Sequence, residues 1–174
     1  MAKVAIFAVR KRGHPSFLLP LIDEKTIREL IESELEGSSY FVVDVSVKPG
    51  NRIEVSLDGD EGLPIKKCVE VSRFVEKEFD REEHDYSLQV MSAGLGYPLK
   101  LHRQFVKNAG RDVKYVLTDG RAGEAKMKEV DEKGILLWNQ KKVKVEGKKK
   151  KILVEEEQRI EYSELKEVRV KLSF

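Results

Sequence analysis

Residues 86–105 read Y-S-L-Q-V-M-S-A-G-L-G-Y-P-L-K-L-H-R-Q-F. Tyr86, Leu88 and Val90 alternate with polar residues, which is the period-two pattern of a half-buried strand. The pattern ends at two glycines and a proline, which favour turns and interrupt a strand ladder. Before this point the sequence predicts helices and strands, and after it only short strands. The stretch therefore predicts a boundary between two different small domains.

The sequence before the boundary predicts two helices and three strands in the order α-β-β-α-β. Apolar residues recur at helical spacing after Asp23, a suitable N-cap, and again after Pro64, which favours the first turn of a helix. Alternating patterns predict strands over residues 40–47 and 52–57, and the turn residues between them indicate an antiparallel hairpin. The strand that begins at Tyr86 completes the domain. Helices with one apolar side beside such strands predict a two-layer sandwich.

The sequence after the boundary predicts a different architecture. Five or so short strands in about 65 residues, with a single helical turn before the last strand, indicate a small closed β-barrel. The fold class is therefore α+β. The predicted division is an N-terminal extension of uncertain order (1–21), an α/β sandwich (22–93), a hinge linker (94–106) and a barrel (107–174).

The boundary stretch resembles the RimP family of bacterial ribosome maturation factors. The resemblance lies in a strand, then S-x-G-L-x-x-P-L, then a short basic connection, and is carried by Val90, Ser92, Gly94, Leu95, Pro98, Leu99 and Phe105. The chain differs at Ala93, where the family usually has proline, and at Gly96-Tyr97, where it usually has an Asp-Arg pair. The resemblance covers residues 22–174 and implies that the barrel is of the SH3-like or Sm-like kind.

The resemblance also implies a function. It predicts a non-catalytic assembly factor that binds the immature small (30S) ribosomal subunit, in contact with ribosomal RNA and a small-subunit ribosomal protein. We expect a cytoplasmic protein, because no apolar run approaches the ~20 residues that span a bilayer. We also expect a monomer. The motif itself is predicted to act as the hinge, through Ser92, Gly94, Leu95, Gly96, Pro98 and Leu99.

No pattern in the sequence predicts a catalytic, metal or cofactor site. None of the three histidines, His14, His84 and His102, is followed by a second ligand at i+3 or i+4. Cys68 is the single cysteine, so the chain forms no intramolecular disulfide. Residues 59–62 have the G-x-x-G spacing of a nucleic-acid clamp, but the two central residues are acidic and favour an ordinary turn.

The distribution of charge indicates a polyanionic partner for the C-terminal half. Residues 1–106 hold 15 Lys and Arg against 18 Asp and Glu, whereas residues 107–174 hold 18 against 13. Such basic groups neutralise phosphates without reading sequence, although a solvated surface explains them equally well at the lysine-rich hairpin tip. The predicted contacts with ribosomal RNA are Lys100, Arg103, Lys107, Arg111, Lys114, Lys148, Lys149, Lys150 and Lys151.

A second function belongs to a different class. The barrel could bind peptides in an SH3-type groove, for which Tyr115, Trp138 and Tyr162 are the candidate aromatic residues. This function needs these rings to be exposed side by side, whereas a core position would exclude it.

The lysine tip generates a first prediction. Replacing the four lysines of residues 148–151 by serine should leave the fold intact, because a hairpin tip buries little surface. It should weaken binding to small subunits and flatten the salt dependence by about one unit of slope for each phosphate that the variant no longer neutralises. Binding measured across a salt titration tests this, and an unchanged slope would leave the tip as a solvated surface.

Overall fold

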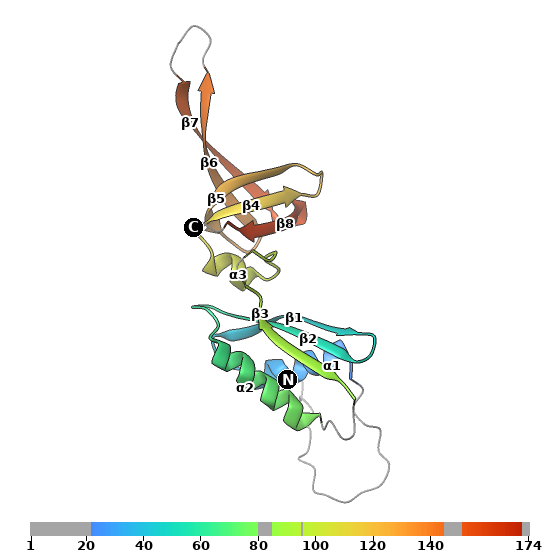
Figure 1. Cartoon of the computed structure of the whole chain (residues 1–174). Coiled ribbons are helices and arrows are strands. Elements are labelled where there is room, and N and C mark those ends of the chain that lie inside the picture. The colour runs from blue at the N-terminus through green and yellow to red at the C-terminus, as the bar shows by residue number, and fades with distance from the viewer. Residues whose placement is uncertain (1–21, 80–84, 95, 145–150, 172–174) are drawn as a thin grey trace, which may run out of the picture.

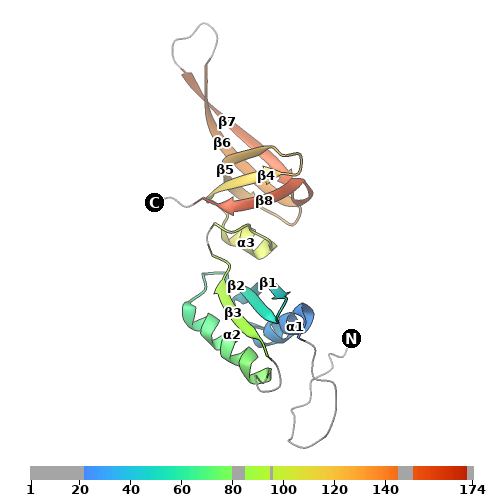
Figure 2. The ribbon, with the colours of Figure 1, turned by 45° about the vertical axis from the view of Figure 1, so that its right-hand side comes forward.

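The computed structural model describes residues 22–79, 85–94, 96–144 and 151–171, which form two bodies stacked along one long axis (Figures 1 and 2). The N-terminal body contains a three-stranded sheet with two helices, and the C-terminal body contains a five-stranded sheet. A short helix lies between the two sheets in both views.

The N-terminal body has the predicted order α-β-β-α-β. Its elements are α1 (Glu24–Glu34), β1 (Tyr40–Lys48), β2 (Arg52–Gly59), α2 (Ile65–Glu78) and β3 (Ser87–Ser92). The first two strands form the predicted antiparallel hairpin, and β3 pairs parallel to β2 after the crossover through α2. The sheet is therefore mixed, in the order β1-β2-β3.

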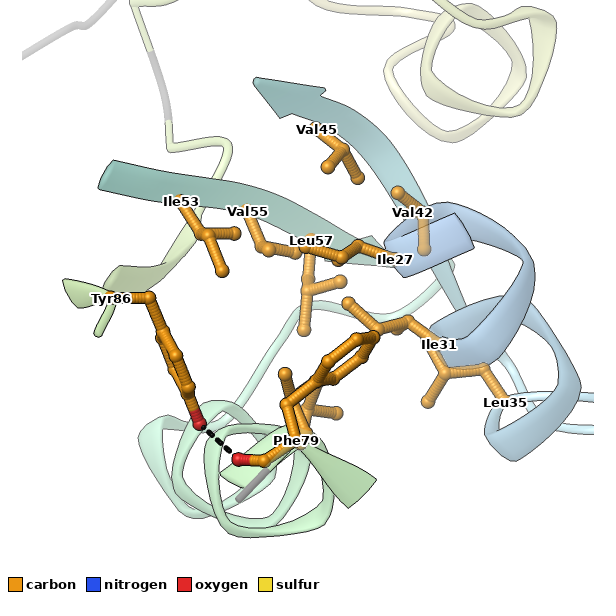
Figure 3. Close-up of a cluster of buried hydrophobic side chains, with 12 residues drawn as sticks. Ile27, Ile31, Leu35, Val42, Val45, Ile53, Val55, Leu57, Phe79 and Tyr86 are labelled. Atoms are coloured by element: carbon orange, nitrogen blue, oxygen red, sulfur yellow. Dashed lines mark hydrogen bonds between the residues drawn. The ribbon is translucent and has the colours of Figure 1, made fainter. Parts of the chain in front are cut away.

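The core of this body lies between the helices and one face of the sheet (Figure 3). Ile31 of α1, Val75 of α2 and Val55 of β2 are all completely buried. At the edge of this core the Tyr86 hydroxyl donates to the carbonyl of Phe79 at 2.8 Å (Figure 3). Asp23 caps α1 as predicted, because its carboxylate accepts from the Thr26 amide at 2.9 Å.

The C-terminal body is a five-stranded antiparallel sheet in the order β7-β6-β5-β4-β8. Its elements are α3 (His102–Lys107), β4 (Asp112–Leu117), β5 (Ala122–Val130), β6 (Gly134–Lys144), β7 (Lys151–Glu161), a 3₁₀ turn (Tyr162–Glu164) and β8 (Leu165–Val170). Its core is a second, separate cluster that includes Phe105, Val113, Met127, Ile160 and Val168. The five strands and the turn before the last one agree with the prediction.

Two features differ from the sequence prediction. A helix, α3, lies within the stretch predicted as linker, so helices do not stop at the boundary. Closure of the barrel is not shown. In the part of the chain that the structure describes, β7 and β8 are the two edge strands of the sheet, and they do not pair with each other. The described C-terminal body is thus an antiparallel sheet around one core.

The strands β6 and β7 continue beyond the sheet as a two-stranded arm (Figure 1). Their pairing runs as far as Lys144 opposite Lys151, whereas β5 pairs with β6 only up to Trp138. Lys151 begins β7, and the other predicted tip residues, Lys148, Lys149 and Lys150, lie outside the described residues.

The N-terminal core yields a prediction for stability. Ile31→Ala truncates a side chain at a site with no exposure, so it should lower the free energy of unfolding by about 2–5 kcal/mol. Val69→Ala is the control, since Val69 lies on α2 and is 43% exposed, and it should change stability by less than about 0.5 kcal/mol. Urea denaturation measures both, and similar effects would contradict the described core.

Candidate functional site

The helix α3 belongs to the C-terminal body. The side-chain oxygen of Gln104 accepts from the amides of Lys100 and Leu101 at 2.9 and 3.2 Å, which satisfies donors at the start of the helix. Phe105 is buried in the C-terminal core, and its ring centroid lies 5.1 Å from that of Tyr162. These contacts orient the opposite side of α3 toward the N-terminal sheet.

The chain just before α3 is held to the same body. The Leu99 amide donates to the carbonyl of Val168 at 2.8 Å. Pro98 forms an isolated bridge with Arg169, whose guanidinium donates to the carbonyl of Gly96 at 3.0 Å. The C-terminal body therefore begins close to Gly96, before the end of the predicted linker.

The N-terminal body meets α3 through an acidic turn, which we define as residues 58–60 at the end of β2. Asp58 is 8% exposed, and its carboxylate accepts from the Gly59 amide at 2.8 Å. A side chain at Gly59 is excluded, because a Cβ there would lie 2.5 Å from the carbonyl oxygen of Gly62 and 2.7 Å from the ring of Tyr40. The G-x-x-G sequence is therefore a tight turn that directs carboxylates toward α3.

Two cations of the C-terminal body contact carboxylates of this acidic turn. The Lys107 ammonium lies 2.5 Å from the Asp58 carboxylate and also donates to the Gly59 carbonyl at 2.8 Å. Arg103 donates with two nitrogens to the two oxygens of Asp60, at 3.1 and 2.6 Å. We call these two ion pairs, together with the pair of Lys100 and Asp44, the junction.

The remaining contacts extend the junction toward the sheet. Lys100 donates to Asp44 of β1 at 2.7 Å. The guanidinium carbon of Arg103 also lies 4.4 Å from the ring centroid of Phe41, a cation–π contact. Gln104 donates to the second oxygen of Asp58 at 3.1 Å. Asp58 thus accepts from both bodies.

The three ion pairs differ in exposure. The side chains of Lys107 and Asp58 are 20% and 11% exposed, whereas those of Arg103 and Asp60 are 46% and 45% exposed. Lys100 and Asp44 are similarly exposed. Because solvent and salt screen exposed charges, the Lys107–Asp58 pair carries most of the electrostatic attraction across the junction.

Two hollows flank the chain segment that joins the bodies. One, of about 360 Å³, is lined by the acidic turn, Lys107, Arg111 and Tyr97. The other, of about 440 Å³, lies between the uncovered face of the N-terminal sheet and the segment around Pro98, and it also reaches Tyr97. Tyr97 is 66% exposed. The two bodies therefore pack against each other mainly along the strip of ion pairs.

The predicted hinge residues lie around a short connection. The Ala93 amide donates to the carbonyl of Leu57 at 2.8 Å, so β3 remains attached to the N-terminal body up to this point. Gly94 and Gly96 have φ angles of +51° and +96°, a region that favours glycine. Ser92 ends β3, and its hydroxyl accepts from the Gly94 amide at 3.3 Å. Leu95 lies outside the described residues.

The predicted RNA-contact residues fall in three places. Lys100, Arg103 and Lys107 are brought together, as their spacing suggested. They lie at the junction, where each pairs with a carboxylate of the N-terminal body. Arg111 is exposed and donates to Asn108 at 3.3 Å, and Lys114 pairs with Glu124 at 3.3 Å on the outer surface of β4. Lys151 begins β7, and Lys148, Lys149 and Lys150 lie outside the described residues.

Sequence reasoning missed the carboxylates that complete the junction, Asp44, Asp58 and Asp60, as well as Gln104. The acidic N-terminal and basic C-terminal halves were a signal that the two bodies attract each other. The contacts are 43 to 56 residues apart in sequence, and no local pattern pairs them.

The aromatic residues proposed for a peptide groove are engaged elsewhere. Tyr115 and Tyr162 pack against the C-terminal core. His102 Nδ1 lies 3.1 Å from the Tyr162 hydroxyl, and burial, with the nearby charge of Asp131, raises the pKa of Tyr162. Trp138 is half-buried on β6. These positions do not form the exposed aromatic surface that an SH3-type peptide site needs.

Within the described ranges, no three His, Cys, Asp or Glu side chains form a group that could hold a metal ion. No described helix combines the length and the apolar character required to cross a bilayer. The fold and the junction define an α+β protein in which an α/β body and a β body are joined by charge.

Comparison with known proteins identifies the family. The family model for the RimP N-terminal domain matches residues 30–96. The chain is 38% identical over 152 residues to ribosome maturation factor RimP of Christiangramia forsetii, which covers 87% of this chain and 96% of that protein. It is 37% identical over 153 residues to the RimP of Flavobacterium psychrophilum, which covers 87% of this chain and 98% of that protein. It is also 37% identical over 131 residues to the RimP of Porphyromonas gingivalis, which covers 75% of this chain and 86% of that protein. The chain belongs to the RimP family of ribosome maturation factors, which are non-catalytic assembly factors.

The junction yields a third prediction. In a double-mutant cycle on Lys107→Met and Asp58→Asn, the coupling energy should be about 1 kcal/mol or more, because the pair is largely buried. The control cycle, Lys100→Met with Asp44→Asn, should give less than about 1 kcal/mol, because both side chains are roughly half exposed. Urea denaturation gives both values. Equal coupling energies in the two cycles would show that burial does not determine which ion pair is the stronger.

Proposed function

We propose that this protein binds the immature small (30S) ribosomal subunit in the cytoplasm and assists its maturation without catalysis. The observation that carries the proposal is the extent of the family match: the relatives named as ribosome maturation factors align with 87% of this chain and with 96–98% of their own length. Both bodies are therefore included in the similarity. We propose that the protein acts as a monomer in contact with ribosomal RNA and a small-subunit ribosomal protein.

The C-terminal body is the proposed RNA-facing part. Its excess of basic residues supports this, because lysine and arginine neutralise phosphates and release counterions. Arg111 is exposed at the rim of the smaller hollow, where a backbone phosphate has access to its guanidinium. The proposed contacts remain Lys100, Arg103, Lys107, Arg111, Lys114, Lys148, Lys149, Lys150 and Lys151.

We also propose that the C-terminal body is a barrel of the SH3-like kind. What supports this is that both outer strands of the sheet contribute to one core, β7 through Ile160 and β8 through Val168. The 3₁₀ turn before β8 is at the position that the sequence pattern predicted. Curling around a single core brings the outer strands of a sheet toward each other.

Sedimentation with purified ribosomal particles tests the proposed function. The protein should sediment with free small subunits, and much less with large subunits or assembled ribosomes. The variant Arg111→Glu with Lys114→Glu should reduce this association, and its reduction should be greatest at low salt, because phosphate contacts are screened.

A matched control exchanges the same charges far from the proposed surface. Lys25→Glu with Lys66→Glu alters exposed lysines on α1 and α2, whose side chains are 83% and 87% exposed. This control should sediment like the unaltered protein. An even distribution over all particles, or no association with small subunits at low salt, would reject the proposed function.

A further inference from the structure

In the part of the chain that the structure describes, the two bodies meet through the junction and a short connection. Their apolar cores share no residue among those that the structure describes. The N-terminal body holds the chain up to Ala93, through the hydrogen bond to Leu57, and the C-terminal body holds it again from Pro98, through the bridge to Arg169. Between these points lie Gly94 and Gly96, both with positive φ. Such a connection offers little resistance to rotation of one body against the other.

The relative orientation of the bodies is therefore set mainly by charge. Lys100, Arg103 and Lys107 lie along one side of the segment that ends in α3, and each contacts a carboxylate of the N-terminal body. Two of these pairs are roughly half exposed, and hollows of about 360 and 440 Å³ flank the connection. Water and ions thus have access to the junction from the sides.

The carboxylates occupy positions that suit phosphate groups. The forked contact of Arg103 with both oxygens of Asp60 has the bidentate geometry that arginine forms equally well with a phosphate. Lys100 and Lys107 are point charges with no preference between the two anions. Removing the carboxylates would leave three cations in a row without internal counterions.

We propose that the junction is a latch that RNA phosphates open. In the closed form, Asp44, Asp58 and Asp60 neutralise the three cations; when the protein binds RNA, phosphates of the backbone replace the carboxylates and the two bodies rotate apart at the connection between Ala93 and Pro98. The proposal deepens the proposed function, on which it rests, by assigning these cations a contact that exists only in the bound state. It also explains how residues already paired within the chain contribute to RNA binding.

Competition between the two anions determines the behaviour of the latch. Screening shortens from about 10 Å at 0.1 M salt to about 3 Å at 1 M, so salt alone should weaken the closed form. A backbone of closely spaced phosphates supplies several anions at once, and each contact releases counterions. Opening therefore accompanies binding, and a closed junction limits the affinity.

The distance between the bodies tests the opening directly. Spin labels are placed at Ser33→Cys on α1 and Thr118→Cys after β4, both exposed, in a protein that carries Cys68→Ser. Pulsed electron resonance should give one narrow distance distribution at about 0.1 M salt, and a broad or shifted one at about 1 M. A short RNA duplex added at about 0.1 M salt should have the same effect. A distribution that neither salt nor the duplex changes would overturn the latch.

Removal of the internal anions tests the competition. Asp44→Asn with Asp60→Asn leaves the more buried Lys107–Asp58 pair in place, so the distribution without RNA should broaden, but less than at about 1 M salt. The affinity for the duplex should rise by about threefold or more over the control. The control, Glu29→Gln with Glu70→Gln, removes two charges from helices away from the junction, where both carboxylates pair with lysines on the same helix. An affinity no higher than that of the control would overturn the latch.

The two proposals fail in different ways. A protein that opens with the duplex but does not sediment with small subunits would keep the latch and reject the proposed function. A protein that sediments with small subunits while its distance distribution stays constant would reject the latch alone. Sedimentation and distance measurements on the same labelled protein separate these outcomes.

Discussion

The pairing of Lys107 with Asp58 is the interaction on which the arrangement of the molecule depends. Asp58 receives the Lys107 ammonium and the Gln104 amide from one body and the Gly59 amide from its own. A carboxylate that is 8% exposed needs such partners, because an unpaired buried charge is costly. The other contacts of the junction surround this pair, and they align α3 across the end of the N-terminal sheet. An electrostatic connection thus replaces the continuous apolar interface that rigidly fixes two domains.

The basic residues of the junction are paired and yet accessible. Three unpaired cations so close together would repel one another, and each is instead paired with a carboxylate of the N-terminal body. In the junction the same side chains are neutralised and yet half exposed at two of three positions. The arm of β6 and β7 extends away from the junction (Figure 2).

Much of the fold could be predicted from local sequence patterns. The α-β-β-α-β order follows from helical and alternating spacing, and the Asp23 cap and the hairpin between β1 and β2 formed as expected. The parallel pairing of β3 with β2 was not apparent, since it depends on the crossover through α2. The helix α3 was missed because six residues are too few to show a helical repeat in the sequence. Its stability comes from contacts of Gln104 and Phe105. Half of the site could be predicted from the sequence. The spacing of the cations brought them together, but their carboxylate partners are dozens of residues away in sequence.

The separation of the two cores has a consequence for the order in which the two bodies fold during synthesis. Every described strand and helix of the N-terminal body precedes residue 93, and its core takes no described residue from beyond it. Domains generally fold as units in the order in which they are synthesised. The N-terminal body can therefore complete its core, with the acidic turn on its surface, before the C-terminal body has formed. The charge pairing of the junction then comes last, because it needs α3, which packs into the C-terminal core through Phe105.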